Sequence, residues 1–271
     1  MLTRRHIRIK VMQSVYSFSL GEEKKLDDET IFFKESVAQS FNLYLLLLAL
    51  LKALKNFTEE QLTAYEKHQI NRDENFQKLT HLSKNKVLLF IDQHPQLEQH
   101  LKNKKFIRWD LEFTFLKALL KEITSADAFR SYFETKEPTP KEDLKWVMKC
   151  FKEIIAPSSY LYSYLEDHQL TWIDDLPVVN TFIMKMLKQL DPKQSNTLQF
   201  PKPIENLEDL DFGVSLLEKT LSKDEQLLKE LEGKTPNWDA DRIAKLDQVI
   251  LKIAIAELLY FPNIPTKVTL N

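Results

Sequence analysis

The sequence contains very little glycine: three residues in 271, which are Gly21, Gly213 and Gly233. Average usage is roughly 7%. Three isolated glycines cannot form a G-x-G-x-x-G fingerprint or a P-loop, so the common dinucleotide-binding and P-loop enzymes are excluded. They also cannot supply the tight turns that connect the strands of a β-sandwich or barrel. The composition therefore predicts an all-α protein.

Cysteine and long apolar runs are scarce as well. The single cysteine, Cys150, excludes an intramolecular disulfide and a zinc site built from several cysteines. We interpret it as a buried, unreactive thiol on a helix. The most apolar run, LYLLLLALL at residues 43–51, has nine residues, whereas a bilayer-spanning helix needs about 20. We therefore expect a buried core helix and no membrane partner. No secretory signal is visible, which favours a cytoplasmic protein.

Residue patterns of enzymes and metal sites are missing too. The six histidines form no H-E-x-x-H motif or other close ligand pair, and there is no G-x-S-x-G elbow around a serine. Neighbouring acids such as Asp174 and Asp175 would point in different directions on a helix. We therefore predict no metal site, no cofactor and no catalytic activity.

Helical periodicity is what the sequence does contain. Apolar residues recur every three or four positions, and prolines or polar stretches separate these segments. A charged loop is expected at residues 22–29 and a longer, proline-containing linker at 191–205. The expected helical segments are 3–20, 29–65, 97–134 (as one or two helices), 142–155, 172–190, 209–231 and 237–261.

The N-terminal segment is the one place where charge is strongly asymmetric. The whole chain has a formal charge of −2, but its first twenty residues contain no acid and four bases: Arg4, Arg5, Arg8 and Lys10. Arg4 and Arg8 share a helix face, with Arg5 beside them. Such a patch suits phosphate contacts, and Tyr16, about two turns beyond, could stack on an unpaired base. The alternative interpretation is a solvated helix end without a ligand.

Two sequence motifs stand near the two ends of the chain. The run RRHIRIKVMQSVYSF, from Arg4 to Phe18, has an arginine cluster followed by Gln13 and Tyr16, and it resembles the opening helix of the NusB family. Residues 238–271 resemble its C-terminal signature. The matching residues there are Trp238, Arg242, Ile243, Asp247, Ile250, Leu251, Ala254, Glu257, Leu258, Ile264, Pro265, Lys267 and Val268. Two motifs in the right order are more specific than either one alone.

This resemblance implies an all-α, NusB-like helical bundle with a large helical insertion after the first helix. Residues 1–20 and 206–271 would form the core, and residues 21–205 the insertion. The family usually continues through further helices after the position of Asn271. We therefore expect a core that is incomplete at its C-terminus, with an exposed apolar groove along Ile250, Ile253 and Leu258. Glu257 would cap a helix or pair with a neighbouring base.

The function that the resemblance implies is transcription antitermination without catalysis. The protein would bind single-stranded, boxA-type RNA of ribosomal RNA transcripts together with the ribosomal protein NusE, and would join the RNA polymerase antitermination complex. Arg4, Arg5, Arg8 and Tyr16 would contact RNA. His6 stands where the family often has arginine, so its charge would depend on pH. The alternative is a helical protein-interaction scaffold that does not bind RNA, with the insertion as its docking surface.

Overall fold

The structure is a computed structural model, and it describes residues 1–21, 25–68, 70–102, 104–190, 198, 200–231 and 244–270. In this part of the chain the regular elements are helices, and an isolated β-bridge joins Leu2 to Ile204. The predicted all-α class is confirmed. Several residues named above lie outside the described ranges: Gly233, Trp238, Arg242, Ile243 and Asn271.

The chain folds into two compact units. Met1–Gln39 and Lys202–Asn271 form one, which we call the terminal unit, and Ser40–Pro201 form the other, the central unit. The boundary between Gln39 and Ser40 falls inside the longest helix, α2 (Leu26–Lys67), which has 42 residues. The chain thus begins in the terminal unit, builds the central unit and then returns.

Helix α2 contains the apolar run. Among the described helices, α2 is the one that is long and apolar enough to cross a membrane. The core helix of a folded protein can meet the same criteria, and 67% of the most apolar 18-residue window of α2 is buried. Residues 43–51 are all buried, as predicted. The predicted loop at 22–29 is wrong in its second half, because α2 already begins at Leu26. The acids at residues 27–29 occupy its first turn, where the helix dipole stabilises negative charge.

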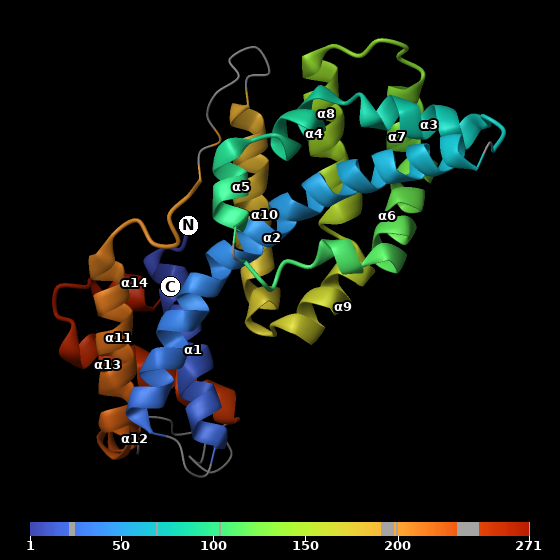
Figure 1. The fold of residues 1–271 in the computed structure, drawn as a ribbon. Helices are drawn as coiled ribbons and strands as arrows, with labels where there is room; N and C mark the ends of the chain where they lie inside the picture. Colours follow the sequence, from blue (N-terminus) through green and yellow to red (C-terminus); the bar gives the residue numbers. More distant parts are fainter. Residues whose placement is uncertain are drawn as a thin grey trace. The chain divides into compact units, whose positions relative to one another are not determined.

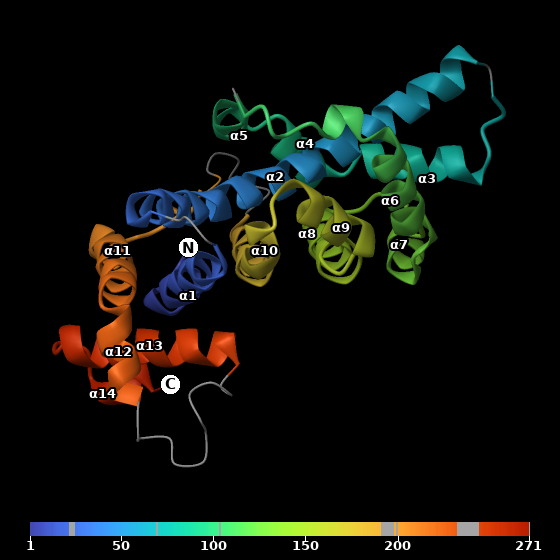
Figure 2. The ribbon, with the colours of Figure 1, turned by 90° about the horizontal axis from the view of Figure 1, so that it is seen from below.

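The terminal unit is built around α1 (Arg4–Leu20). This helix packs on α11 (Leu207–Ser222) and α13 (Lys245–Tyr260), and Figure 2 shows the three helices together. Two shorter helices, α12 (Asp224–Leu231) and α14 (Thr266–Thr269), contact α13. The expected helix at 209–231 is therefore two helices.

The break between α11 and α12 has a local cause. It falls at Lys223, and Asp224 and Glu225 then occupy the first turn of α12, where acids are favoured. The Asp224 carboxylate accepts a hydrogen bond from Lys252 Nζ at 2.6 Å, which links α12 to α13.

Gly213 allows the helices of the terminal unit to approach closely. A Cβ atom at this position would lie 2.5 Å from Cζ of Phe33 and 2.6 Å from Cγ2 of Ile7. Both of these side chains are fully buried, so neither can move aside easily. A side chain at residue 213 would therefore force α11 away from α1 and from the start of α2.

The central unit consists of the rest of α2 and of shorter helices. Figure 2 shows α10, α8 and α6 following one another along one side of α2. The elements are α3 (Glu74–Ser83), α4 (Lys86–Asp92), α5 (Pro95–Leu101), the 3₁₀ turn η1 (Trp109–Leu111), α6 (Phe113–Ser125), α7 (Asp127–Phe133), α8 (Pro140–Cys150), the π turn η2 (Phe151–Ile155), α9 (Ser159–His168) and α10 (Thr171–Gln189) (Figure 1).

The expected segment 97–134 is more interrupted than its periodicity suggests. It contains α5, η1, α6 and α7. The Trp109 side chain lies in the interruption between α5 and α6, and its Nε1 donates to the carbonyl oxygen of Leu46 at 2.9 Å. This buried tryptophan anchors the non-helical stretch on α2, a tertiary contact that overrides the local preference for helix.

A buried polar network joins three helices of the central unit. The Tyr132 hydroxyl donates to Oδ1 of Asp143 at 2.6 Å and accepts from Nδ2 of Asn85 at 2.9 Å. Asp143 is completely buried, and its Oδ2 accepts from the backbone N–H of Lys86 at 2.9 Å. Burial, together with the bond to Asp143, raises the pKa of Tyr132. The network fixes α4, α7 and α8 relative to one another.

Cys150 ends α8 on its buried side. Its side chain is 4% exposed, and burial raises the pKa of the thiol to about 12. The thiolate is the reactive form, so this cysteine is unreactive at neutral pH, as the sequence predicts.

Candidate nucleic-acid interface

The first turn of α1 is organised by Thr3 and His6. The backbone N–H of Thr3 donates to Nδ1 of His6 at 3.1 Å, so the imidazole serves as the acceptor of a capping box. Burial lowers the pKa of His6 below 6.5, and the nearby charges of Arg5, the N-terminus and Lys10 lower it further. His6 is therefore mostly neutral at pH 7 and adds little charge to the surface.

Arg8 makes the strongest contact of the basic cluster. Its Nε and Nη2 donate to the two carboxylate oxygens of Glu257, each at 2.7 Å. Glu257 is 1% exposed, and its Oε1 also accepts from the Thr269 hydroxyl at 2.7 Å. A single buried carboxylate thus joins α1, α13 and α14. The interpretation of Glu257 as the partner of a base is confirmed, and Arg8 has a structural role.

Arg4 is also engaged, although it is more exposed. Its Nε donates to Oδ1 of Asp209 at 2.7 Å, which ties α1 to the first turn of α11. The guanidinium groups of Arg4 and Arg8 lie 5.3 Å and 5.2 Å from the ring centroid of Phe212, within the range of cation–π attraction. The Arg4 side chain keeps 45% of its surface exposed, so a second contact remains accessible to it.

The remaining residues of the cluster differ in exposure. Lys10 is buried and 2% exposed, so it does not contribute to the outer surface. Arg5 is exposed, and no carboxylate of the described residues lies within ion-pair distance of it. Tyr16 is half-buried. The spacing of Arg5, Ile9, Met12 and Tyr16 places these four residues along one stripe of α1.

A groove of about 370 Å³ lies beside this stripe. Ile250 and Ile253 line it, as expected from the sequence, whereas Leu258 is not among its lining residues. Sequence reasoning missed Ile9 and Met12, although their spacing of four and seven residues from Arg5 could have revealed them. The lining residues are Arg5, Arg8, Ile9 and Met12 of α1, Ile250, Ile253, Ala254 and Glu257 of α13, and Val268 and Thr269 of α14.

The surface combines an exposed cation with apolar side chains. Ile9 is 40% exposed and Ile250 is 47% exposed, so both can contact a ligand directly. Within the described ranges there is no group of three or more histidine, cysteine or acidic side chains that could hold a metal ion. The arrangement is suited to binding an anionic ligand that also has flat or apolar faces.

Comparisons with known proteins identify the C-terminal part of the chain. Residues 179–271 match the model of the NusB family. The transcription antitermination protein NusB of Geotalea daltonii is 42% identical over 60 residues, which are 22% of this chain and 41% of that protein. NusB of Natranaerobius thermophilus is 36% identical over 66 residues, or 24% of this chain and 45% of that protein.

A further relative extends the matched length slightly. NusB of Crocosphaera subtropica is 30% identical over 80 residues, which are 28% of this chain and 38% of that protein. The chain thus spans less than half the length of these curated relatives. No solved structure matches it. Residues 179–271 are therefore similar to the NusB family, and residues 1–178 lie outside this match.

Proposed function

We propose that the protein is a non-enzymatic transcription antitermination factor of the cytoplasm. It binds single-stranded, boxA-type RNA of ribosomal RNA transcripts together with NusE, and it joins the RNA polymerase antitermination complex. The similarity to NusB proteins supports the general role. Its support in the structure is one observation: the exposed Arg5 guanidinium stands at an apolar groove and has no carboxylate partner among the described residues.

The organisation of the family core is part of this proposal. We assign residues 1–20 and 206–271 to the RNA-binding core and residues 21–205 to the insertion. The packing of α1 on α11 and α13 supports the pairing of the two ends, because it brings both motif-bearing ends of the chain into one compact unit, which also includes residues 21–39 and 202–205. The ion pair between Arg8 and Glu257 joins one residue from each motif.

Within this surface the side chains have distinct roles. Arg5 contacts a phosphate or a base edge, since its guanidinium is unpaired in the described structure and can donate two parallel hydrogen bonds. Tyr16 offers a ring on which an unpaired base can stack. Arg4 adds a second, weaker contact from its exposed side, and Arg8 holds α1 in place on α13.

Fluorescence anisotropy with a labelled boxA-like RNA, measured with and without NusE, tests the proposal directly. We expect Arg5→Ala to weaken binding about tenfold, because one charge-assisted contact is lost. Lys34→Ala, an exposed residue of α2 that does not line the groove, is the matched control and should leave affinity unchanged. Equal affinities for Arg5→Ala and the unaltered protein, or for boxA-like and shuffled RNA, would contradict it.

Tyr16 permits a second test in the same assay. Tyr16→Phe keeps the ring and should bind RNA normally, whereas Tyr16→Ala should lose about 1–3 kcal/mol of binding energy. Loss of affinity in Tyr16→Phe would point to the hydroxyl and not to stacking.

The alternative function, a protein-interaction scaffold without RNA binding, is favoured by one observation of its own. Asp209 and Glu257 neutralise Arg4 and Arg8, which removes half of the four positive charges seen in the sequence. A protein that shows no boxA affinity, but recovers protein partners from a nuclease-treated lysate, would support this alternative.

A further inference from the structure

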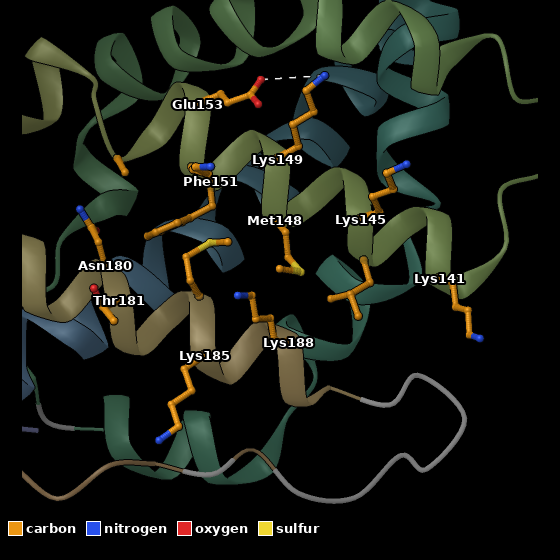
Figure 3. A pocket seen from close by; sticks show the side chains of 14 residues that line it. Lys141, Lys145, Met148, Lys149, Phe151, Glu153, Asn180, Thr181, Lys185 and Lys188 are labelled. Carbon is orange, nitrogen blue, oxygen red and sulfur yellow. Dashed lines mark ion pairs between the residues drawn. The ribbon is translucent and has the colours of Figure 1, made fainter.

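The central unit carries an apolar groove with lysines along its edges. The groove lies between α8, with the π turn η2, on one side and α10 on the other, and its volume is about 960 Å³ (Figure 3). Leu144, Met148 and Met184 supply apolar lining. Six lysines also line it: Lys141, Lys145, Lys149, Lys152, Lys185 and Lys188.

Helical spacing explains how one groove receives both residue types. On α8, Lys141, Lys145 and Lys149 follow one another at intervals of four residues, and Leu144 and Met148 repeat at the same interval beside them. Residues four apart share a helix face, so the lysines form one row and the apolar side chains form the next. The two rows therefore run side by side along the helix.

Three of the six lysines, Lys141, Lys152 and Lys188, have no ion pair or ring contact in the described part of the chain. The ion pair recorded there joins Nζ of Lys149 to Oε2 of Glu153 at 3.9 Å, which is a long contact (Figure 3). Nζ of Lys185 lies 5.8 Å from the ring centroid of Phe182. Another acid close by, Glu142, already accepts bonds from Thr139 at the start of α8. These bonds and the nearby charge of Lys145 lower the pKa of the Glu142 carboxyl. Like charges four residues apart on a helix destabilise it. An anionic occupant would remove this cost.

The same groove also contains a buried hydrogen-bond acceptor that has no donor among the described residues. Oδ1 of Asn180, on α10, is buried and has no hydrogen-bond partner among the described residues. Asn180 lines the groove (Figure 3). A buried acceptor without a partner destabilises the folded protein, so a hydrogen-bond donor that entered the groove would be stabilised there.

The composition of the lining distinguishes between classes of anionic ligand. Single-stranded nucleic acids are held by arginine and by exposed aromatic rings on which bases stack. This groove contains no arginine, and its aromatic residue, Phe151, is fully buried. An apolar floor with basic edges instead complements a helix whose apolar stripe is flanked by acids. We propose that the α8–α10 groove is a docking site for an acidic amphipathic helix of a partner protein.

A peptide selection tests this proposal on the full chain. The probe is a display library of random 16-residue peptides, with counter-selection on the Lys145→Glu/Lys185→Glu variant. The enriched peptides should carry apolar residues at i, i+3, i+4 and i+7 with aspartate or glutamate beside them. By fluorescence anisotropy, the best synthetic peptide should bind this variant at least about tenfold more weakly and lose affinity with added salt.

Matched variants separate the groove from overall charge. Lys121→Glu/Lys136→Glu changes two exposed lysines of the same unit outside the groove, and it should keep affinity within about twofold. Met148→Gln changes the apolar floor of the groove without altering its charge, and it should also weaken binding of the peptide. Circular dichroism checks that every variant remains helical. If the Lys145→Glu/Lys185→Glu variant does not fold, the peptide affinity of Met148→Gln tests the proposal instead.

Three results would overturn the proposal. Enriched peptides without an acidic bias would show that charge does not select the ligand. Equal binding of the peptide to the groove variants and the control variant would show that the groove is not the binding site. If instead an oligouridine RNA bound the chain and lost affinity only in the groove variants, while no peptide was enriched, the groove would be a nucleic-acid surface and not a protein-docking site.

Discussion

The two basic surfaces of this protein use their charges differently. In the terminal unit, Arg4 and Arg8 are paired with Asp209 and Glu257 and hold helices together. In the central unit, the lysines of the α8–α10 groove have only the long Lys149–Glu153 ion pair among the described residues, and Lys145 lies near Glu142. A cluster of basic residues in a sequence therefore does not show whether their charges stabilise the fold or remain available to a ligand. Residue type is more informative, because arginine binds a carboxylate with two parallel bonds and lysine acts as a point charge.

Both units nevertheless use charge to join their helices. The terminal unit has ion pairs and a ring, Phe212, under two guanidinium groups. In the central unit, the buried Lys55 of α2 pairs with Asp92 of α4 at 3.2 Å, and the stacked rings of Tyr132 and Trp146 have centroids 4.8 Å apart. The contrast therefore concerns the two basic surfaces and not the units as a whole.

The largest change in stability is expected for a substitution of Arg8, which tests whether the terminal unit uses this charge to hold its helices together. Arg8→Ala leaves the Glu257 carboxylate buried without its partner, and we expect a loss of about 3–5 kcal/mol in the free energy of unfolding. Urea denaturation followed by circular dichroism measures it. The double variant Arg8→Met/Glu257→Leu should recover most of the loss, since no charge then remains buried. A single variant as stable as the unaltered protein would show that Arg8 is not structural.

Close packing in the terminal unit predicts the next largest effect. Gly213→Ala places a methyl group against Phe33 and Ile7, and overpacking of this kind costs about 1–3 kcal/mol. Thermal unfolding is a suitable measurement. Gly21→Ala is the matched control, because Gly21 is exposed and has an ordinary φ of −96°. Equal melting temperatures for the two variants would argue against close contact between α11 and α1.

A lysine of the groove should behave unlike Arg8. Lys145→Gln removes one exposed charge whose neighbours at four residues on either side have the same sign. We expect the free energy of unfolding to change by no more than about 0.5 kcal/mol. The same urea titration used for Arg8→Ala makes the comparison direct. A loss as large as that of Arg8→Ala would mean that the lysines also serve the fold.

The smallest effect concerns pH and His6. Because the folded protein has a lowered pKa at His6, the unfolded chain binds more protons between that pKa and 6.5. Stability from this residue is present above pH 6.5 and is lost as the pH falls through the folded pKa. Burial lowers the pKa of His81 and His94 too, so the difference between the unaltered protein and His6→Gln isolates the contribution of His6. Melting temperatures at pH 5 and pH 7.5 measure that difference.

Sequence periodicity was sufficient to predict the longer helices and the buried face of α1, but not the breaks within residues 97–134 and 209–231. Ile7 and Val11 are fully buried, as their spacing indicates. The partners of the arginines could not be predicted from spacing, because Arg8 and Glu257 are 249 residues apart. One signal was present, however. Glu257 stands in the apolar run IAIAELLY, and an acid on the buried face of a helix requires a cationic or hydrogen-bonding partner.

The α8–α10 groove shows the same limit. The lysine row of α8 is visible in the sequence, but only the packing of α10 against α8 places Lys185 and Lys188 opposite it. Helix pairing depends on contacts between distant segments, which a single sequence does not specify. The unpartnered oxygen of Asn180 is equally invisible before the fold is known.

The ion pairs of α1 have a consequence for ionic strength. If all four bases of α1 neutralised phosphates of a single-stranded RNA, the counterions released from the RNA would give a logarithmic salt slope of about −2.8, since single strands contribute about −0.7 per neutralised phosphate. Arg4 and Arg8 are already compensated internally, and Lys10 is shielded from solvent. With Arg5 as the main uncompensated base, the slope should be close to −0.7. Attraction at this helix would then persist at salt concentrations that dissociate a fully solvated basic arm.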